Sequence, residues 1–217
     1  MTMIDGDPHS GLPVLHAGAP LGQAPATIVM LHGRGASPAN ILDLMPRLAR
    51  PTLTYLAPTA SDRSWYPFSF MSDVAKNEPR LSSALRAIGA VVDQAEAAGV
   101  PHSKIILLGF SQGACLSCEF AIRHGSRLGG VIAFSGGAIG APGTEWHHRG
   151  HFDRMPVFLG CSDIDAHIPE TRVSETAEVF TRMGADVTKR IYPGMGHLVN
   201  DDEVAYAQRL IDACIAG

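Results

Sequence analysis

The 217-residue sequence predicts an α/β fold in which helices cover both faces of a mostly parallel sheet. Short apolar runs rich in Val, Ile and Leu alternate along the chain with longer segments whose apolar residues recur every three or four positions. Hydrophobic residues make up 46% of the chain and charged residues 18%, a balance typical of a globular protein. The length suits one well-buried core, so we expect a single domain over residues 1–217.

Six runs have the composition of strands that are buried on both faces, as in a parallel sheet. In chain order they cover residues 26–31, 52–56, 104–108, 130–134, 156–159 and 187–192. Because helical segments separate several of these strands, consecutive strands are expected to lie parallel to each other.

Four longer segments have helical periodicity. Residues 81–98 carry one apolar stripe, residues 112–124 follow Ser111 and stop at Gly125, and residues 170–183 end before Gly184. In a last helix, Asp201 and Asp202 are expected to cap the N-terminus.

A candidate nucleophile stands between a strand and a helix. Gly109-Phe110-Ser111-Gln112-Gly113 follows the third predicted strand and opens the second predicted helix. Side chains at positions 109 and 113 would collide where strand and helix pass closely, so only glycine fits there. The same pattern occurs in ordinary Gly/Ser loops, but this context favours a strained turn that exposes the Ser111 hydroxyl.

A serine hydroxyl needs a base within hydrogen-bond reach and an acid that orients the base. His197 follows the last strand in Gly194-Met195-Gly196-His197 and is the candidate base. Asp163 and Asp165 both follow the strand at residues 156–159, and their positions alone leave both as candidate acids. If Asp165 is the acid, Asp163 is expected to form a turn by accepting from amides of its own loop.

The oxyanion of such a reaction needs two backbone donors. One is expected from Gln112, the residue after the nucleophile. The other is expected from Arg34, in the Gly-rich turn His32-Gly33-Arg34-Gly35 that follows the first strand. A phosphate-binding loop is disfavoured because the Lys-Ser/Thr ending is missing.

Two clusters suggest metal or redox chemistry only weakly. His147, His148 and His151 lie in a polar loop without Cys or carboxylate partners at ligand spacing, so a solvated loop is favoured. Cys115 and Cys118 are expected to be buried apolar residues. We therefore expect no metal and no cofactor.

Together these segments resemble the phospholipase/carboxylesterase family, which groups acyl-protein thioesterases, lysophospholipases and small carboxylesterases. The likeness runs from about Ala26 to the C-terminus and also includes Leu56-Ala57-Pro58 and Asp165-x-x-Ile168-Pro169. The resemblance implies an α/β-hydrolase fold, catalytic Ser111, Asp165 and His197, and oxyanion amides at Arg34 and Gln112. The Asp-x-x-Ile-Pro step is what favours Asp165 over Asp163.

The chain departs from thioesterase members at two places. Ala36-Ser37 follows Gly35 where those members tend to have an Asp, and an aromatic turn replaces their Trp-Phe-Asp. We interpret this turn as one wall of an apolar substrate pocket, with core packing as the alternative; its residues are Trp65, Tyr66, Phe68, Phe70 and Met71. The stretch between Phe134 and Pro156 is too short for a lipase-type lid, which favours short-chain or aryl esters.

These features predict a serine hydrolase that cleaves small-molecule esters or thioesters through an acyl-enzyme, with activity rising as the histidine base loses its proton. The alternatives are a non-catalytic binding protein of the same fold, or lysophospholipase or acyl-protein thioesterase specificity. The net charge of −4, without a basic run, argues against nucleic acid. The acidic start and the lack of a long apolar segment predict a cytoplasmic protein without membrane insertion, either a monomer or a homodimer.

Overall fold

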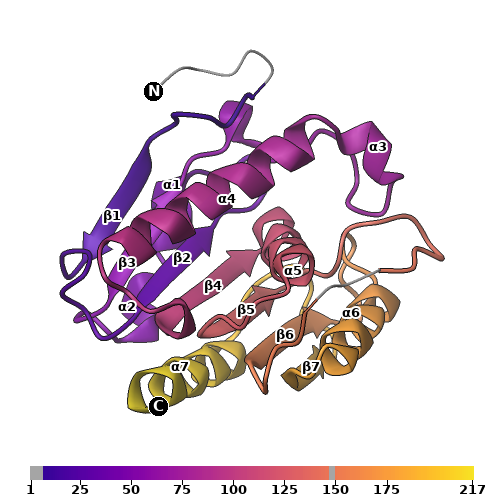
Figure 1. Cartoon of the computed structure of the whole chain (residues 1–217). Coiled ribbons are helices and arrows are strands. Elements are labelled where there is room, and N and C mark those ends of the chain that lie inside the picture. Colours follow the sequence, from indigo (N-terminus) through magenta and orange to yellow (C-terminus); the bar gives the residue numbers. More distant parts are fainter. Residues whose placement is uncertain (1–6, 147–149) are drawn as a thin grey trace.

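A seven-stranded sheet forms the centre of the protein, whose computed structural model describes residues 7–146 and 150–217 (Figure 1). The strand order is β1-β3-β2-β4-β5-β6-β7, with β1 antiparallel to β3 and the remaining neighbours parallel. The predicted mostly parallel sheet is therefore confirmed. The strands are β1 (Val14–Gly18), β2 (Thr27–Leu31), β3 (Thr54–Pro58), β4 (Ile105–Phe110), β5 (Gly130–Phe134), β6 (Pro156–Ser162) and β7 (Asp186–Tyr192).

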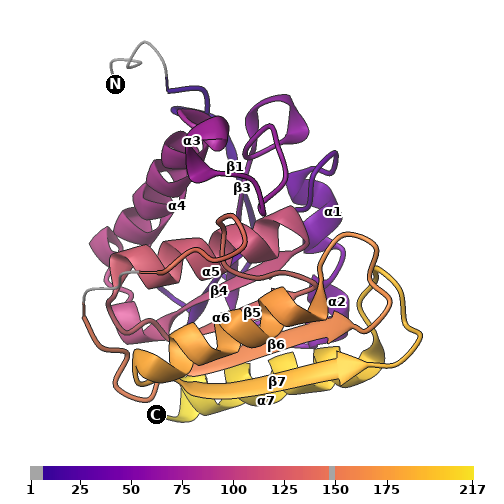
Figure 2. The ribbon, with the colours of Figure 1, turned by 90° about the vertical axis from the view of Figure 1, so that its right-hand side faces the viewer.

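Helices cover both faces of this sheet (Figures 1 and 2). One face carries α4 (Arg80–Ala97), α5 (Gln112–His124) and α6 (Glu170–Arg182), and the other carries α1 (Pro38–Leu42), α2 (Met45–Leu48) and α7 (Asp201–Ala216). Successive side chains of β2 enter opposite layers: Val29 packs in the α4–α6 layer and Met30 in the α7 layer. Both layers are apolar, which explains why the strands carry continuous runs of Val, Ile and Leu. This is the α/β-hydrolase fold.

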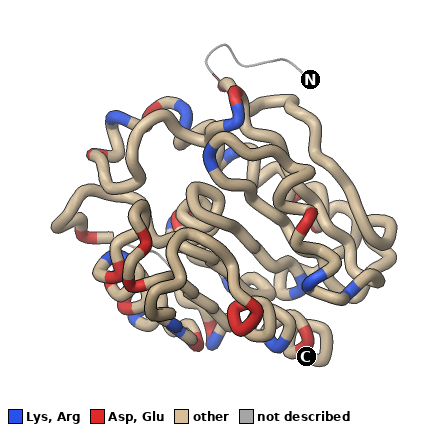
Figure 3. Tube along the Cα trace, turned by 180° about the vertical axis from the view of Figure 1, so that it is seen from behind, with Lys and Arg blue, Asp and Glu red and all other residues tan. Residues whose placement is uncertain are grey.

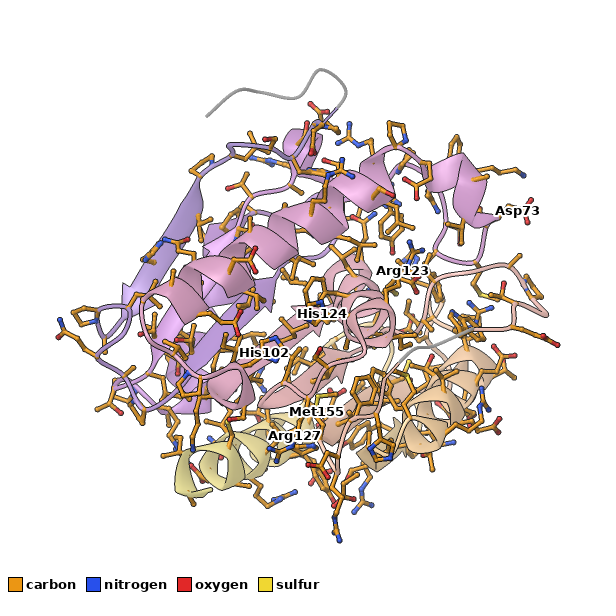
Figure 4. The ribbon with its side chains drawn as sticks, in the orientation of Figure 1. Asp73, His102, Arg123, His124, Arg127 and Met155 are labelled. Atoms are coloured by element: carbon orange, nitrogen blue, oxygen red, sulfur yellow. The ribbon has the colours of Figure 1, made fainter. Side chains whose placement is uncertain are left out.

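Helix ends follow local sequence signals. Gly125 ends α5 at a φ of +67°, as the sequence predicts, and Arg123 and His124 lie in its last turn, where positive charge is favourable (Figure 4). At α7 the prediction was one residue late, because Asn200 is the cap: its side chain accepts from the Glu203 amide, and Glu203 accepts in return from the Asn200 amide.

Several short elements were not predicted. Besides β1, they are α1, α2, α3 (Val74–Asn77) and the two 3₁₀ turns Ser61–Arg63 and His102–Lys104. The short helices are five residues or fewer, which is too few turns for an apolar stripe to repeat. β1 is a half-exposed edge strand and has no continuous apolar run.

The parallel strands end at one edge, which gathers the loops after β2, β4, β6 and β7. Between β5 and β6, residues 135–146 and 150–155 form neither helix nor strand, and the described part of the chain contains no large lid domain. Acidic and basic residues are interspersed along the trace (Figure 3). Within the described ranges no helix has the length and apolar character needed to cross a bilayer.

Candidate active site

Ser111 occupies the sharp turn between β4 and α5. Its φ of 55° and ψ of −120° are strained for a residue with a side chain. A Cβ atom at Gly109 would lie 2.3 Å from the Gly113 carbonyl oxygen, and one at Gly113 would lie 2.1 Å from the Leu31 carbonyl oxygen. Both glycines therefore permit the close approach of α5 to β4 and β2 that the sequence pattern predicts.

A chain of two hydrogen bonds joins Ser111, His197 and Asp165. His197 Nε2 lies 2.9 Å from the Ser111 hydroxyl oxygen, and His197 Nδ1 lies 2.7 Å from a carboxylate oxygen of Asp165. Because a carboxylate only accepts, Nδ1 carries a proton and Nε2 of the neutral ring is left to accept from the serine. The Phe110 ring packs 4.8 Å from the His197 ring, centroid to centroid.

The Asp165 side chain has no exposed surface. Burial raises the pKa of this carboxyl, but the hydrogen bond from His197 and those from the amides of His167 and Ile168 outweigh burial, so the net pKa is lowered. The two amides lie 2.8 and 3.0 Å from the other carboxylate oxygen. Asp165 is therefore held as a fixed negative charge against the imidazole.

Asp163 has a different partner from the one predicted. Its carboxylate accepts from the Gly194 amide at 2.8 Å, in the loop that carries His197, and not from amides of its own loop. The preceding Ser162 hydroxyl accepts from the Gly196 amide at 3.0 Å. The sequence gives no signal for these two hydrogen bonds, because only the β6–β7 pairing brings the two loops side by side.

The Gly33–Arg34 turn lies beside Ser111, and both Arg34 and Gln112 line the same cavity as the serine. Gln112 is the first residue of α5, where amides lack an intrahelical partner. Over the described ranges, neither the Arg34 nor the Gln112 amide donates to another protein group. The neighbouring Gly35 and Ala36 amides donate to the Arg63 and Gly33 carbonyls.

His32, in the same turn, is buried and structural. Its Nδ1 lies 2.8 Å from the Gly33 carbonyl oxygen, and its Nε2 accepts from the Ala60 amide at 3.3 Å. Burial lowers its pKa, against the smaller opposite effect of the Gly33 hydrogen bond, so the ring is held neutral.

A cavity of about 520 Å³ opens over Ser111. Of the five aromatic-turn residues, Tyr66, Phe68 and Phe70 line it, whereas Trp65 and Met71 do not. The prediction for Trp65 is corrected because its ring is fully buried under the His32-Gly33-Arg34-Gly35 turn, where the indole donates to the His32 carbonyl at 2.9 Å. Met71 packs against the hydrophobic core of the α4–α6 layer instead.

Two polar side chains hold the cavity wall, and sequence analysis assigned them no such role. The Gln112 amide group accepts from the Trp65 amide at 3.0 Å and donates to the Tyr66 carbonyl at 2.8 Å. The Arg34 guanidinium donates to the Pro67 and Phe68 carbonyls at 2.8 and 2.7 Å. The residues proposed for the oxyanion therefore also fix the wall through their side chains.

Among the described residues, the remaining candidates form no second centre. His147 and His148 lie outside the described residues, and His151 is exposed. No group of three or more potential metal ligands occurs within residues 7–146 and 150–217. Cys115 and Cys118 are buried free thiols, as predicted.

The chain is similar to known proteins over most of its length. The family model for phospholipase/carboxylesterase matches residues 18–215. A crystal structure described as a phospholipase/carboxylesterase from Dyadobacter fermentans superposes with a TM-score of 0.89 and 39% identity, covering 93% of this chain and 96% of that one. Acyl-protein thioesterase 1 from Eremothecium gossypii is 27% identical over 85% of this chain and 88% of its own length. Lysophospholipase-like protein 1 from Mus musculus is 22% identical, over 86% and 85% respectively.

Proposed function

Because the chain belongs to the phospholipase/carboxylesterase family, we propose that it hydrolyses carboxylic esters or thioesters through an acyl-enzyme on Ser111. In the acylation step, His197 Nε2 removes the hydroxyl proton as the serine oxygen attacks the carbonyl carbon. The new oxyanion accepts from the amides of Arg34 and Gln112. Asp165 keeps the ring in the tautomer that leaves Nε2 free and stabilises the imidazolium that forms.

Collapse of the tetrahedral intermediate expels the alcohol or thiol, which takes its proton from His197. Water then attacks the acyl-enzyme with the same histidine as base and releases the carboxylic acid. Each step needs His197 within reach of both the serine oxygen and the leaving atom.

One observation carries this proposal: the unbroken hydrogen-bond chain of 2.9 and 2.7 Å from the Ser111 hydroxyl through His197 to Asp165. The direct test is hydrolysis of 4-nitrophenyl butyrate by the wild type and by Ser111→Ala. We expect the variant to lose at least about 10⁴-fold in kcat. A variant that keeps substantial turnover would favour the alternative that this fold only binds a small molecule.

Thioester cleavage is the second candidate, supported by the name of the Eremothecium relative. A butyryl thioester and a butyryl ester with leaving groups of matched size measure the preference directly. Where deacylation limits turnover, the two kcat values should be equal because the acyl-enzyme is the same, and the ratio of the two kcat/KM values gives the preference in the acylation step.

We further propose that the protein acts in the cytoplasm on small-molecule substrates, as a monomer or homodimer. Its four cysteines are buried free thiols, which suits a reducing compartment. Light scattering of the purified protein measures the assembly, and fractionation of the source cells measures the location.

A further inference from the structure

The cavity over Ser111 must hold both the leaving group and the acyl group of an ester or thioester. His197 must reach the leaving atom, so the alcohol or thiol lies on the side of His197 and His167, whose rings are 4.8 Å apart. The rest of the lining includes Tyr66, Phe70 and Cys115, and we assign the acyl group to this side of the cavity.

Cys115 is part of the cavity lining on this acyl side. It lies one helical turn after Ser111 in α5, lines the cavity and is only 1% exposed. Its thiol neighbours the Tyr66 hydroxyl, and Tyr66 is also 1% exposed. Behind them the Phe70 ring is 6% exposed and packs against the guanidinium of the buried Arg172, 5.7 Å away.

Hydrogen bonds fix the backbone around Tyr66 and Phe70 on this side of the cavity. The Tyr66 carbonyl accepts from the Gln112 side chain, and the Phe70 carbonyl accepts from the Gly140 amide at 2.8 Å. Arg172 donates to the Gly140 carbonyl at 2.7 Å, so Gly140, which contacts Phe70, is also held in place. A longer acyl chain cannot lengthen the pocket by moving a free loop on this side.

The Cys115 thiol is not reactive. Burial raises the pKa of Cys115 to about 12, so it stays protonated and is no rival nucleophile to Ser111. Its contribution to the cavity is the volume of one sulfur atom.

We propose that Cys115, backed by Tyr66, sets the length of acyl chain that the enzyme accepts, and that the natural acyl group is short. This inference rests on the proposed function, because it requires the acyl-enzyme on Ser111. Removing the sulfur lengthens the acyl side by about one methylene, and adding a carbon shortens it.

The test is the chain-length profile of kcat/KM on 4-nitrophenyl esters from acetate to decanoate, for the wild type, Cys115→Ala and Cys115→Val. Burial of one more methylene raises kcat/KM about fourfold. For the shortest ester that the wild type accepts poorly, Cys115→Ala should therefore raise kcat/KM, relative to kcat/KM for acetate, by about that factor. The valine variant should lower it. Cys118→Ala is the matched control, because Cys118 is a fully buried cysteine in the same helix that does not line the cavity.

An unchanged profile in both Cys115 variants overturns the inference, provided that Ser111→Ala remains inactive, and leaves the proposed function intact. The same shift in Cys118→Ala overturns it as well, because the effect would then come from loosened packing. Turnover by Ser111→Ala would overturn both.

Discussion

Asp165 is the residue on which the proposed reactivity of His197 depends most. Its buried carboxylate accepts hydrogen bonds from the imidazole and from two backbone amides, and these offset the free-energy cost of burying a charge. The charge fixes the ring tautomer and becomes the partner of the imidazolium during reaction.

We therefore expect Asp165→Asn to lower kcat by about 10³- to 10⁴-fold with little change in KM, because the amide favours the wrong tautomer. Stopped-flow and steady-state hydrolysis of 4-nitrophenyl butyrate measure both constants. Asp163→Asn is the matched control: an asparagine oxygen still accepts from the Gly194 amide, so its kcat should fall less than about tenfold. Equal losses in the two variants would contradict the assignment of Asp165.

Glu203 is a second buried carboxyl, but it has fewer hydrogen-bond donors around it than Asp165. One oxygen accepts from the Asn200 amide at 2.9 Å, and the other has no partner among the described residues. Burial raises the pKa of Glu203 to about 7, despite the opposing hydrogen bond from Asn200. Between the ordinary glutamate pKa and this value the folded state binds more protons than the unfolded state, so the free energy of unfolding falls as pH rises.

Glu203→Gln should remove this pH dependence while keeping the helix cap, since Gln also serves at that position. Relative to the wild type, its melting temperature should be nearly equal at pH 5 and higher at pH 8 by roughly 5 °C. Differential scanning calorimetry at several pH values measures the difference. A constant difference across this range would show that Glu203 does not titrate there.

At the scale of elements, the contact between α5 and β2 fixes the position of Ser111. Gly113 lies against the Leu31 carbonyl, so α5 can begin directly at the end of β4 only if position 113 has no side chain. The same contact places the Gln112 amide beside the Gly33–Arg34 turn.

Gly113→Ala is expected to push α5 away from β2, to lower the free energy of unfolding by about 1 to 3 kcal/mol and to reduce kcat. Gly89→Ala in α4 is the control, because a Cβ atom there would be 3.8 Å from the nearest atom, in ordinary contact. That change should instead stabilise the helix by about 0.5 to 1 kcal/mol. Urea denaturation of both variants checks the opposite signs, and equal effects would contradict the close approach.

The elements with repeated signals could be predicted from sequence, and the short ones could not. Residues 170–183 repeat an apolar stripe over three turns or more, and residues 112–124 are bounded by the Ser111 turn and Gly125. Both helices appear within one residue of the predicted ends. β1 is recognisable only as the antiparallel partner of β3, a relation that its own five residues do not encode.

At the scale of the whole molecule, the sheet order decides which distant loops meet. β4 lies between β2 and β5, so the Ser111 turn adjoins the Arg34 turn, while β6 and β7 bring the loops of Asp165 and His197 together. Chain order alone does not determine this arrangement, because parallel strands can be ordered in several ways.

This limit explains which features of the site the sequence can place and which it cannot. The strained turn at Ser111 follows from local glycine spacing, and the sequence shows it directly. The choice between Asp163 and Asp165 is made by the loop–loop geometry, since each carboxylate contacts a different part of the 194–197 loop. Trp65 faces inward because His9 and His32 both pack on it, and neither contact has a signal in the aromatic turn itself.

Reaction with a fluorophosphonate probe, followed by peptide mass spectrometry, shows whether Ser111 is the activated nucleophile. We expect one adduct per chain, on the peptide that contains Ser111, with no adduct in Ser111→Ala and strongly slowed labelling in His197→Ala. Labelling of another residue, or no labelling while the wild type still hydrolyses esters, would contradict this assignment.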